Sequence, residues 1–84
     1  MSDITIYSRT PCGYCSLAKR LLKDRGLAFH EVDLTTQSNI ERELVTRTGQ
    51  RTVPQIFIGD RFIGGYTELA LLIRDGRLTS MLAG

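Results

Sequence analysis

Apolar residues follow two periodicities along this chain, one typical of strands and the other typical of helices. Short apolar or alternating runs predict four strands, at about residues 3–8, 28–34, 56–58 and 61–63. The dipeptide Gly59-Asp60 separates the last two runs and is a turn signal, so we expect these two strands to form a hairpin.

Between and after these strands, apolar side chains recur every three or four residues, which predicts helices. The helical stripes are Leu17, Ala18, Leu21 and Leu22; Ile40, Leu44 and Val45; Leu69, Leu72 and Ile73; and a short last group of Leu78, Met81 and Leu82. Gly26, Gly49 and Gly76 are placed to end the first three helices. Thr36 or Ser38 is the expected N-cap of the second helix.

The elements therefore follow the order strand, helix, strand, helix, strand, strand, helix, with a short helix at the end. A right-handed crossover through the first helix makes the first two strands parallel, and the hairpin adds an antiparallel pair. The predicted fold class is α/β, with a mixed four-stranded sheet flanked by helices.

Length and charge narrow the choice of function. The 84 residues, 42% of them apolar, are enough for one small core, so we expect a single domain over residues 1–84. A net charge of +2 is too small to indicate nucleic-acid binding. The longest apolar run, residues 69–73, is far shorter than the ~20 residues of a membrane span. The start of the chain has no signal-peptide pattern, so we expect a cytoplasmic protein with no membrane contact.

The two cysteines form the motif Cys12-Gly13-Tyr14-Cys15, for which three interpretations compete. A structural disulfide would close a ring of about four residues and contribute only ~2 kcal/mol. Zinc usually takes four ligands, and beyond the pair the chain offers only His30 and carboxylates. A redox-active dithiol is the usual meaning of this spacing in a cytosolic α/β protein, and we favour it. His30 falls on the second strand, where we expect it to be structural or solvent-facing.

The position of the pair predicts different roles for the two sulfurs. Cys12 falls near the N-cap of the first helix, where free backbone N–H groups and the helix dipole lower the pKa of a thiol. Arg9 adds positive charge three residues upstream. Cys15 lies one turn inside the helix and is expected to be less exposed. Cys12 is therefore the predicted attacking nucleophile, and Cys15 the residue that resolves the mixed disulfide.

Three motifs in this order and spacing resemble those of the glutaredoxins, over essentially the whole chain. They are Ile6-Tyr7-Ser8-Arg9 leading into the cysteine motif, Thr52-Val53-Pro54-Gln55-Ile56-Phe57-Ile58, and Ile63-Gly64-Gly65 before Glu68-Leu69. The resemblance implies a thioredoxin-like fold and glutathione-dependent thiol–disulfide exchange. It also implies a cis peptide bond before Pro54, although only about 5–6% of X–Pro bonds are cis.

The resemblance further implies a glutathione site. The backbone of Val53 would pair with the cysteinyl part of glutathione, and Arg9, in a position usually held by lysine, would bind the glycine carboxylate. The helix beginning after Gly65 would receive the γ-glutamyl carboxylate on backbone N–H groups. The expected glutathione-binding residues are Arg9, Tyr14, Thr52, Val53, Pro54, Gly65, Tyr66, Thr67 and Glu68.

Some positions depart from the family pattern. Gly13 stands where proline is common, and Pro11 directly precedes Cys12. Many bacterial relatives have Cys-Asp-Asp where this chain has residues 66–68. Here Thr67 is an expected capping residue, and Glu68 would replace an acid that meets the glutathione ammonium group.

The leading hypothesis is a monomeric enzyme that uses glutathione as co-substrate and reduces protein disulfides and glutathionylated proteins. One alternative is a dimer that holds a [2Fe–2S] cluster through Cys12 of each chain and two glutathiones, which relatives without proline at the position of Gly13 can form. Another is a glutaredoxin-like donor that is reduced by thioredoxin reductase. Arg9, the segment Thr52-Val53-Pro54 and the pair Gly64-Gly65 together argue against the last, because they suit the charged ends of glutathione.

Overall fold

The first strand, β1 (Ile4–Ser8), lies inside the sheet and buries every second side chain. It pairs in parallel with β2 (His30–Asp33) and antiparallel with β3 (Gln55–Ile58), which continues through a turn into its antiparallel neighbour β4 (Arg61–Gly64). The sheet order is β2-β1-β3-β4, so the predicted mixed four-stranded sheet is confirmed. This computed structural model describes residues 2–83, and the two terminal residues of the predicted domain lie outside that range.

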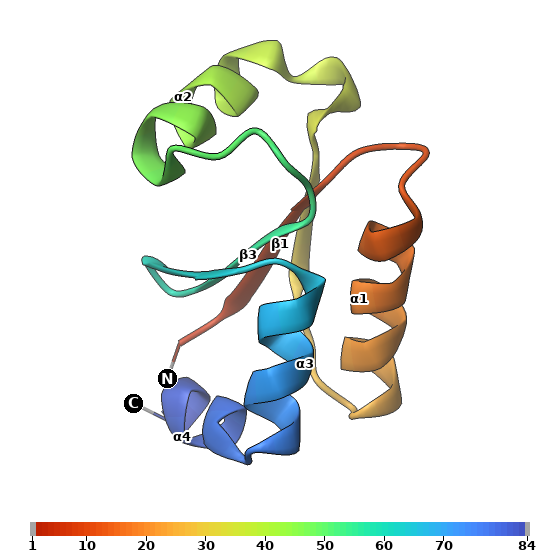
Figure 1. Ribbon diagram of the computed structural model, residues 1–84, viewed down its shortest axis with the longest axis vertical. Coiled ribbons are helices and arrows are strands. Elements are labelled where there is room, and N and C mark those ends of the chain that lie inside the picture. Colours follow the sequence, from red (N-terminus) through yellow and green to blue (C-terminus); the bar gives the residue numbers. More distant parts are fainter. Residues whose placement is uncertain (1, 84) are drawn as a thin grey trace.

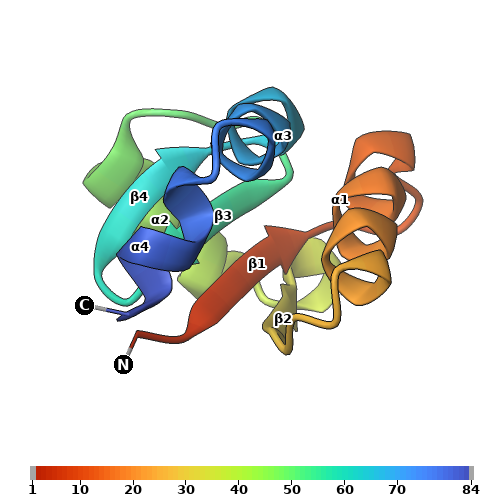
Figure 2. The ribbon, with the colours of Figure 1, turned by 90° about the horizontal axis from the view of Figure 1, so that it is seen from below.

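Helices cover both faces of the sheet (Figures 1 and 2). The helices α1 (Gly13–Asp24) and α3 (Tyr66–Arg74) pack side by side on one face, and α4 (Arg77–Ala83) adjoins α3. The helix α2 (Ser38–Thr48) covers the other face. None of these helices is long and apolar enough to cross a membrane.

Two apolar clusters hold the layers together, one on each face of the sheet. The larger cluster joins β1 and β3 to α1, α3 and α4, and its buried members are Ile4, Ile6, Ala18, Leu22, Ile56, Ile58, Leu69 and Leu78. The smaller cluster, Leu34, Leu44 and Phe57, packs α2 against the opposite face. The alternation of side chains along β3 explains the division, because Ile56 and Ile58 face one layer and Phe57 faces the other.

The ends of the helices agree with the sequence in part. Gly26 and Gly49 adopt positive φ angles of 68° and 72° just beyond α1 and α2, as predicted. The predicted N-cap of α2 was wrong, because Gln37 occupies that position. Thr36 instead ends a short 3₁₀ helix, η1 (Leu34–Thr36), and Ser38 is already the first residue of α2.

The second strand is shorter than the predicted segment 28–34. Its pairing with β1 runs only from His30, opposite Thr5, to Asp33, opposite Ser8. The Asp33 carboxylate accepts a hydrogen bond from the backbone N–H of Thr35 at 2.9 Å, which turns the chain into η1. The strand therefore ends beside the loop that carries the cysteines.

Candidate active site around the cysteine pair

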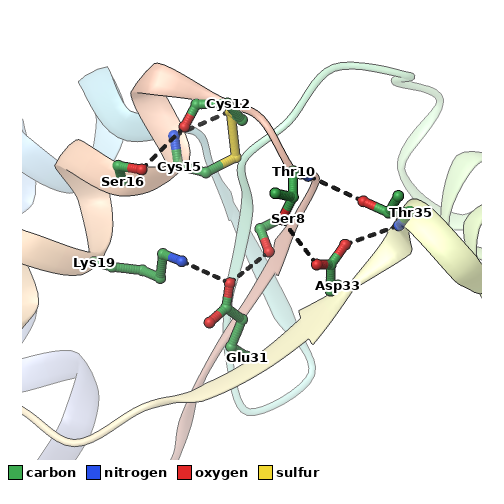
Figure 3. A network of polar contacts seen from close by, with 9 residues as sticks. All are labelled: Ser8, Thr10, Cys12, Cys15, Ser16, Lys19, Glu31, Asp33 and Thr35. Carbon is green, nitrogen blue, oxygen red and sulfur yellow. Dashed lines mark hydrogen bonds and ion pairs between the residues drawn. A yellow bond between two sulfur atoms is a disulfide. The ribbon is translucent and has the colours of Figure 1, made fainter.

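Cys12 and Cys15 lie at the beginning of α1 and are joined by a disulfide (Figure 3). Cys12 is the N-cap residue, with an extended backbone, and its Sγ accepts a hydrogen bond from the backbone N–H of Cys15 at 3.1 Å. Cys15 is 1% exposed, whereas Cys12 is partly accessible. The predicted placement of both sulfurs is therefore confirmed.

This arrangement gives the two sulfurs unequal chemistry. An external thiolate can reach Cys12, while the side chain of Cys15 is shielded by its own helix and the core. The N–H that contacts Cys12 Sγ belongs to the first turn of α1, where donors have no partner within the helix. The same donor stabilises negative charge on Cys12 once the disulfide opens, which favours Cys12 as the attacking thiolate.

Hydrogen bonds attach the segment before Cys12 to the end of β2 (Figure 3). The backbone N–H of Thr10 donates to Thr35 Oγ1 at 3.0 Å, and the Thr10 hydroxyl donates to Asp33 Oδ2 at 2.9 Å. The hydrogen bonds that Asp33 accepts from Thr35, together with that from Thr10, hold the pKa of its carboxyl below the ordinary value. The segment also contains a cis peptide bond between Thr10 and Pro11, which sequence analysis did not predict.

A second polar cluster lies where β1, β2 and α1 meet, beneath the cysteine loop (Figure 3). Glu31 accepts hydrogen bonds from the ammonium group of Lys19 at 2.8 Å and from the hydroxyl of Ser8 at 2.7 Å. The bond from Lys19, followed by that from Ser8, lowers the pKa of Glu31. Ser8 is buried at the end of β1, so this cluster ties the helix that carries the cysteines to the sheet.

A groove of about 200 Å³ adjoins the cysteine motif, and three separate segments of the chain line it. It contains every predicted glutathione-binding residue except Arg9, and adds one that sequence analysis missed, Gln50. The lining residues are Tyr14, Gln50, Thr52, Val53, Pro54, Gly65, Tyr66, Thr67 and Glu68. The rings of Tyr14 and Tyr66 meet across it, with centroids 5.9 Å apart.

The loop on one side of the groove is held by Gln55, which sequence analysis also missed. The peptide bond between Val53 and Pro54 is cis, as the family resemblance implied. The side-chain amide of Gln55 is buried and donates hydrogen bonds to the carbonyl oxygens of Gln50 at 2.8 Å and Thr52 at 2.9 Å. A polar residue directly before the apolar run 56–58 is the signal that could have revealed this role, because buried polar groups need partners.

The other side of the groove is the beginning of α3, whose N-cap is Gly65. The prediction that Thr67 caps this helix was wrong: the backbone N–H of Gly65 donates to Glu68 Oε1 at 2.7 Å instead. Gly64 has a φ of 117°, and a Cβ there would lie 2.6 Å from Cγ of Glu68. The absence of a side chain at Gly64 therefore lets the Glu68 side chain fold back over the start of its own helix.

Arg9 does not line the groove but a larger hollow of about 560 Å³ beside it, which we call the basic cleft. Its guanidinium forms an ion pair with Glu41, in the first turn of α2. The basic cleft is lined by Arg9, Ser38, Glu41, Arg42, Val45, Thr46 and Arg51. The two hollows adjoin along one segment, because Gln50 and Thr52 line the groove while Arg51 between them lines the basic cleft.

His30 lies apart from both hollows. It is the first residue of β2, its side chain is 71% exposed, and its Nε2 is 3.7 Å from a carboxylate oxygen of Asp3. The prediction that it is structural or solvent-facing on the second strand is therefore confirmed.

The cysteine pair lies at the beginning of α1, and a cis-proline loop before β3 lines the groove next to it. In this sheet topology, the two features define a thioredoxin-like thiol–disulfide protein. Comparisons with known proteins narrow the class. Residues 4–63 match the glutaredoxin family model. Over 82 residues the chain is 38% identical to glutaredoxin 3 of Escherichia coli, covering 98% of this chain and 99% of that protein. It is 37% identical to a glutaredoxin of Pseudomonas aeruginosa, with 99% of both chains covered.

Solved structures agree with the sequence comparisons. A crystal structure of a buckwheat glutaredoxin–glutathione complex superimposes with a TM-score of 0.88 at 39% identity, covering 98% of this chain and 77% of that one. The chain belongs to the glutaredoxin family and has the thioredoxin-like fold. It is a glutathione-dependent thiol–disulfide oxidoreductase, as the resemblance implied.

Proposed function

We propose that the enzyme reduces protein disulfides and removes glutathione from glutathionylated proteins, with Cys12 as nucleophile and Cys15 as resolving thiol. The observation that carries this proposal is the asymmetry of the pair, an accessible Cys12 beside the groove and a buried Cys15.

In the proposed cycle, the Cys12 thiolate attacks one sulfur of a substrate disulfide and expels the other as a thiolate. Cys15 then attacks Cys12 Sγ, which releases the second substrate thiol and forms the enzyme disulfide. One glutathione thiolate reopens that disulfide at Cys12, and a second attacks the resulting mixed disulfide to release oxidised glutathione. The substrate gains two electrons, and two glutathiones supply them. A glutathionylated substrate needs only the attack by Cys12 and the release by glutathione.

The proposed position of glutathione follows the groove. Its cysteinyl part pairs with the backbone of Val53, which places its sulfur toward Cys12, and its γ-glutamyl carboxylate meets backbone N–H groups at the start of α3. Glu68 receives the ammonium group on Oε2, because Gly65 already occupies Oε1. The glycine carboxylate extends toward the edge shared with the basic cleft, where Arg9 binds it.

A coupled assay tests the proposal directly. The disulfide form should be reduced by glutathione, with turnover followed through glutathione reductase, and not by thioredoxin reductase. Reduction by thioredoxin reductase alone would instead establish the donor hypothesis.

Arg9→Ala should weaken the use of glutathione by on the order of 1–3 kcal/mol, the range for hydrogen bonds to charged groups. Arg20→Ala, which removes an exposed charge on α1, is the matched control. An unchanged dependence on glutathione in Arg9→Ala would exclude Arg9 from the site.

A second candidate function is a [2Fe–2S] cluster shared by two chains and two glutathiones. The observation that favours it is the open space at Gly13, where an added Cβ would meet nothing within 4 Å, beside the accessible Cys12. Among residues 2–83 no three His, Cys, Asp or Glu side chains form a metal site, so each chain would supply only the Cys12 thiolate.

Anaerobic reconstitution with iron, sulfide and glutathione, followed by absorption spectra and sizing, tests this candidate. Gly13→Pro should suppress the cluster and preserve disulfide exchange, because proline is accepted at the first position of a helix. A colourless monomer from the parent protein would refute the cluster.

Without a cluster, we propose that the enzyme is a monomer that works in the cytoplasm, where the glutathione pool keeps thiols reduced.

A further inference from the structure

The side chain proposed to bind a glutathione carboxylate already binds a carboxylate of its own chain. The guanidinium of Arg9 pairs with the carboxylate of Glu41, and both side chains are partly exposed, at 36% and 28%. An exposed ion pair of this kind is weak and exchanges readily with other ions. A second carboxylate that reaches Arg9 therefore competes with Glu41 for the same guanidinium.

The surroundings of Glu41 allow it to release Arg9 without becoming an isolated charge. Glu41 lies in the first turn of α2, where the positive end of the helix dipole stabilises a carboxylate. That helix has no side-chain hydrogen bond at its N-cap, Gln37. Two further guanidiniums, those of Arg42 and Arg51, line the same basic cleft.

The Arg9–Glu41 ion pair lies beside the proposed path of glutathione. Arg51 lines the basic cleft, and its neighbours on both sides, Gln50 and Thr52, line the groove, so the two hollows are adjacent. A tripeptide held at Val53 and at the start of α3 has its remaining end directed to this edge. Only the carboxylate of the glycine residue carries charge at that end.

We propose that Glu41 is a specificity-determining residue that competes with the glycine carboxylate of glutathione for Arg9. This inference rests on the proposed function of the groove. Glu41 reduces how much the terminal carboxylate contributes to recognition, so the parent enzyme distinguishes less strongly between glutathione and an analogue without that charge than an enzyme without Glu41 would. Removing the charge of Glu41 frees Arg9 and increases the discrimination.

The test compares two small disulfides as substrates, oxidised glutathione and the disulfide of glutathione esterified at its glycine carboxylate. In the Cys15→Ser background, the Cys12 thiolate attacks either disulfide and releases one thiolate, and mass spectrometry follows formation of the mixed disulfide. The measured quantity is the ratio of the two rate constants, glutathione over ester. Glu41→Gln should raise this ratio by about 1.5- to 5-fold, the range of an exposed ion pair, and Arg9→Ala should lower it toward one.

Two controls separate competition from other effects of charge. Glu43→Gln removes the same charge from the same helix, outside the basic cleft, and should leave the ratio unchanged. In the Arg9→Ala background, Glu41→Gln should have no effect on the ratio, because the contested guanidinium is gone.

Three results would overturn the inference. An unchanged ratio in Glu41→Gln would show that the pair does not compete, and a lowered ratio would show that Glu41 orients Arg9 for binding. An effect that persists without Arg9 would assign the change to direct repulsion between carboxylates. Failure of the proposed function gives a different result, since then neither disulfide would react with Cys12 faster than with a free thiol.

Discussion

Replacing Leu69 with alanine tests how strongly the groove depends on the core beneath it. Leu69 lies in the second turn of α3, is fully buried, and packs in the cluster that joins α1, α3 and the sheet. The turn before it supplies the residues 66–68 that line the groove. The substitution removes a packed isobutyl group and leaves a cavity under the beginning of α3.

The size of the effect follows from this burial. Truncation of a fully buried leucine to alanine destabilises a protein by about 2–5 kcal/mol. At about 0.05–0.15 kcal/mol per residue, a chain of 84 residues has a free energy of unfolding of roughly 4–13 kcal/mol. The variant should therefore lose a large fraction of its stability, with a melting temperature lower by at least ~8 °C.

Leu71 provides a matched control on the same helix. Its side chain is 40% exposed, so Leu71→Ala makes the same chemical change with little loss of packing. Its effect should stay near 0.5 kcal/mol, as for most surface substitutions. Urea unfolding of both variants with the cysteine pair oxidised measures the two free energies, and disulfide exchange well below both melting temperatures measures function.

The expected pattern is a large loss of stability in Leu69→Ala with exchange activity close to the parent, because Leu69 does not line the groove. Similar free energies of unfolding for the two variants would refute the reasoning, since burial would then not determine the effect. A large loss of activity in a fully folded Leu69→Ala variant would show that the core controls the shape of the groove.

Three further predictions concern the cysteines and the polar cluster beneath them. Cys12→Ser should abolish disulfide exchange. In the reduced parent protein, the alkylation rate of Cys12 should rise at pH values well below the free-thiol pKa of ~8.5. A rise only near that value would contradict the role of the α1 N-terminus. Cys15→Ser should still remove glutathione from a mixed disulfide but fail on substrates that need a dithiol; equal loss of both activities would show that Cys15 does more than resolve. Because hydrogen bonds from Lys19 and Ser8 lower the pKa of Glu31, its stabilising contribution is complete above the ordinary value of 4.5 and is lost as pH falls through the lowered value. Urea midpoints measured against pH should accordingly fall less steeply on acidification in Glu31→Gln, and identical slopes would exclude this contribution.

Much of the fold was predictable because short stretches of the sequence determine the helices and strands. The stripe that contains Leu22 and the glycine that ends α1 lie within one helix, and the parallel pairing of β1 and β2 follows from the helix between them. The errors occurred at the starts of helices and at both ends of β2, which is shorter than predicted. A side chain can bond to more than one nearby backbone group. The Asp33 carboxylate begins η1 by bonding Thr35, so α2 starts later, after Gln37, which makes no side-chain cap bond. At α3 it is Glu68, not Thr67, that bonds the backbone N–H of the N-cap residue Gly65.

The sequence alone determined that two cysteines lie one turn apart at the start of a helix, and it carries the motifs of a glutaredoxin. These features depend on spacing within a few residues, which helix geometry converts directly into position. The tertiary structure decided which distant side chains meet. It directs Arg9 to Glu41 rather than into the groove, and it places Gln55 where it braces the loop before β3. Such contacts depend on how α2 and the sheet pack together, and no local pattern in the chain encodes that packing.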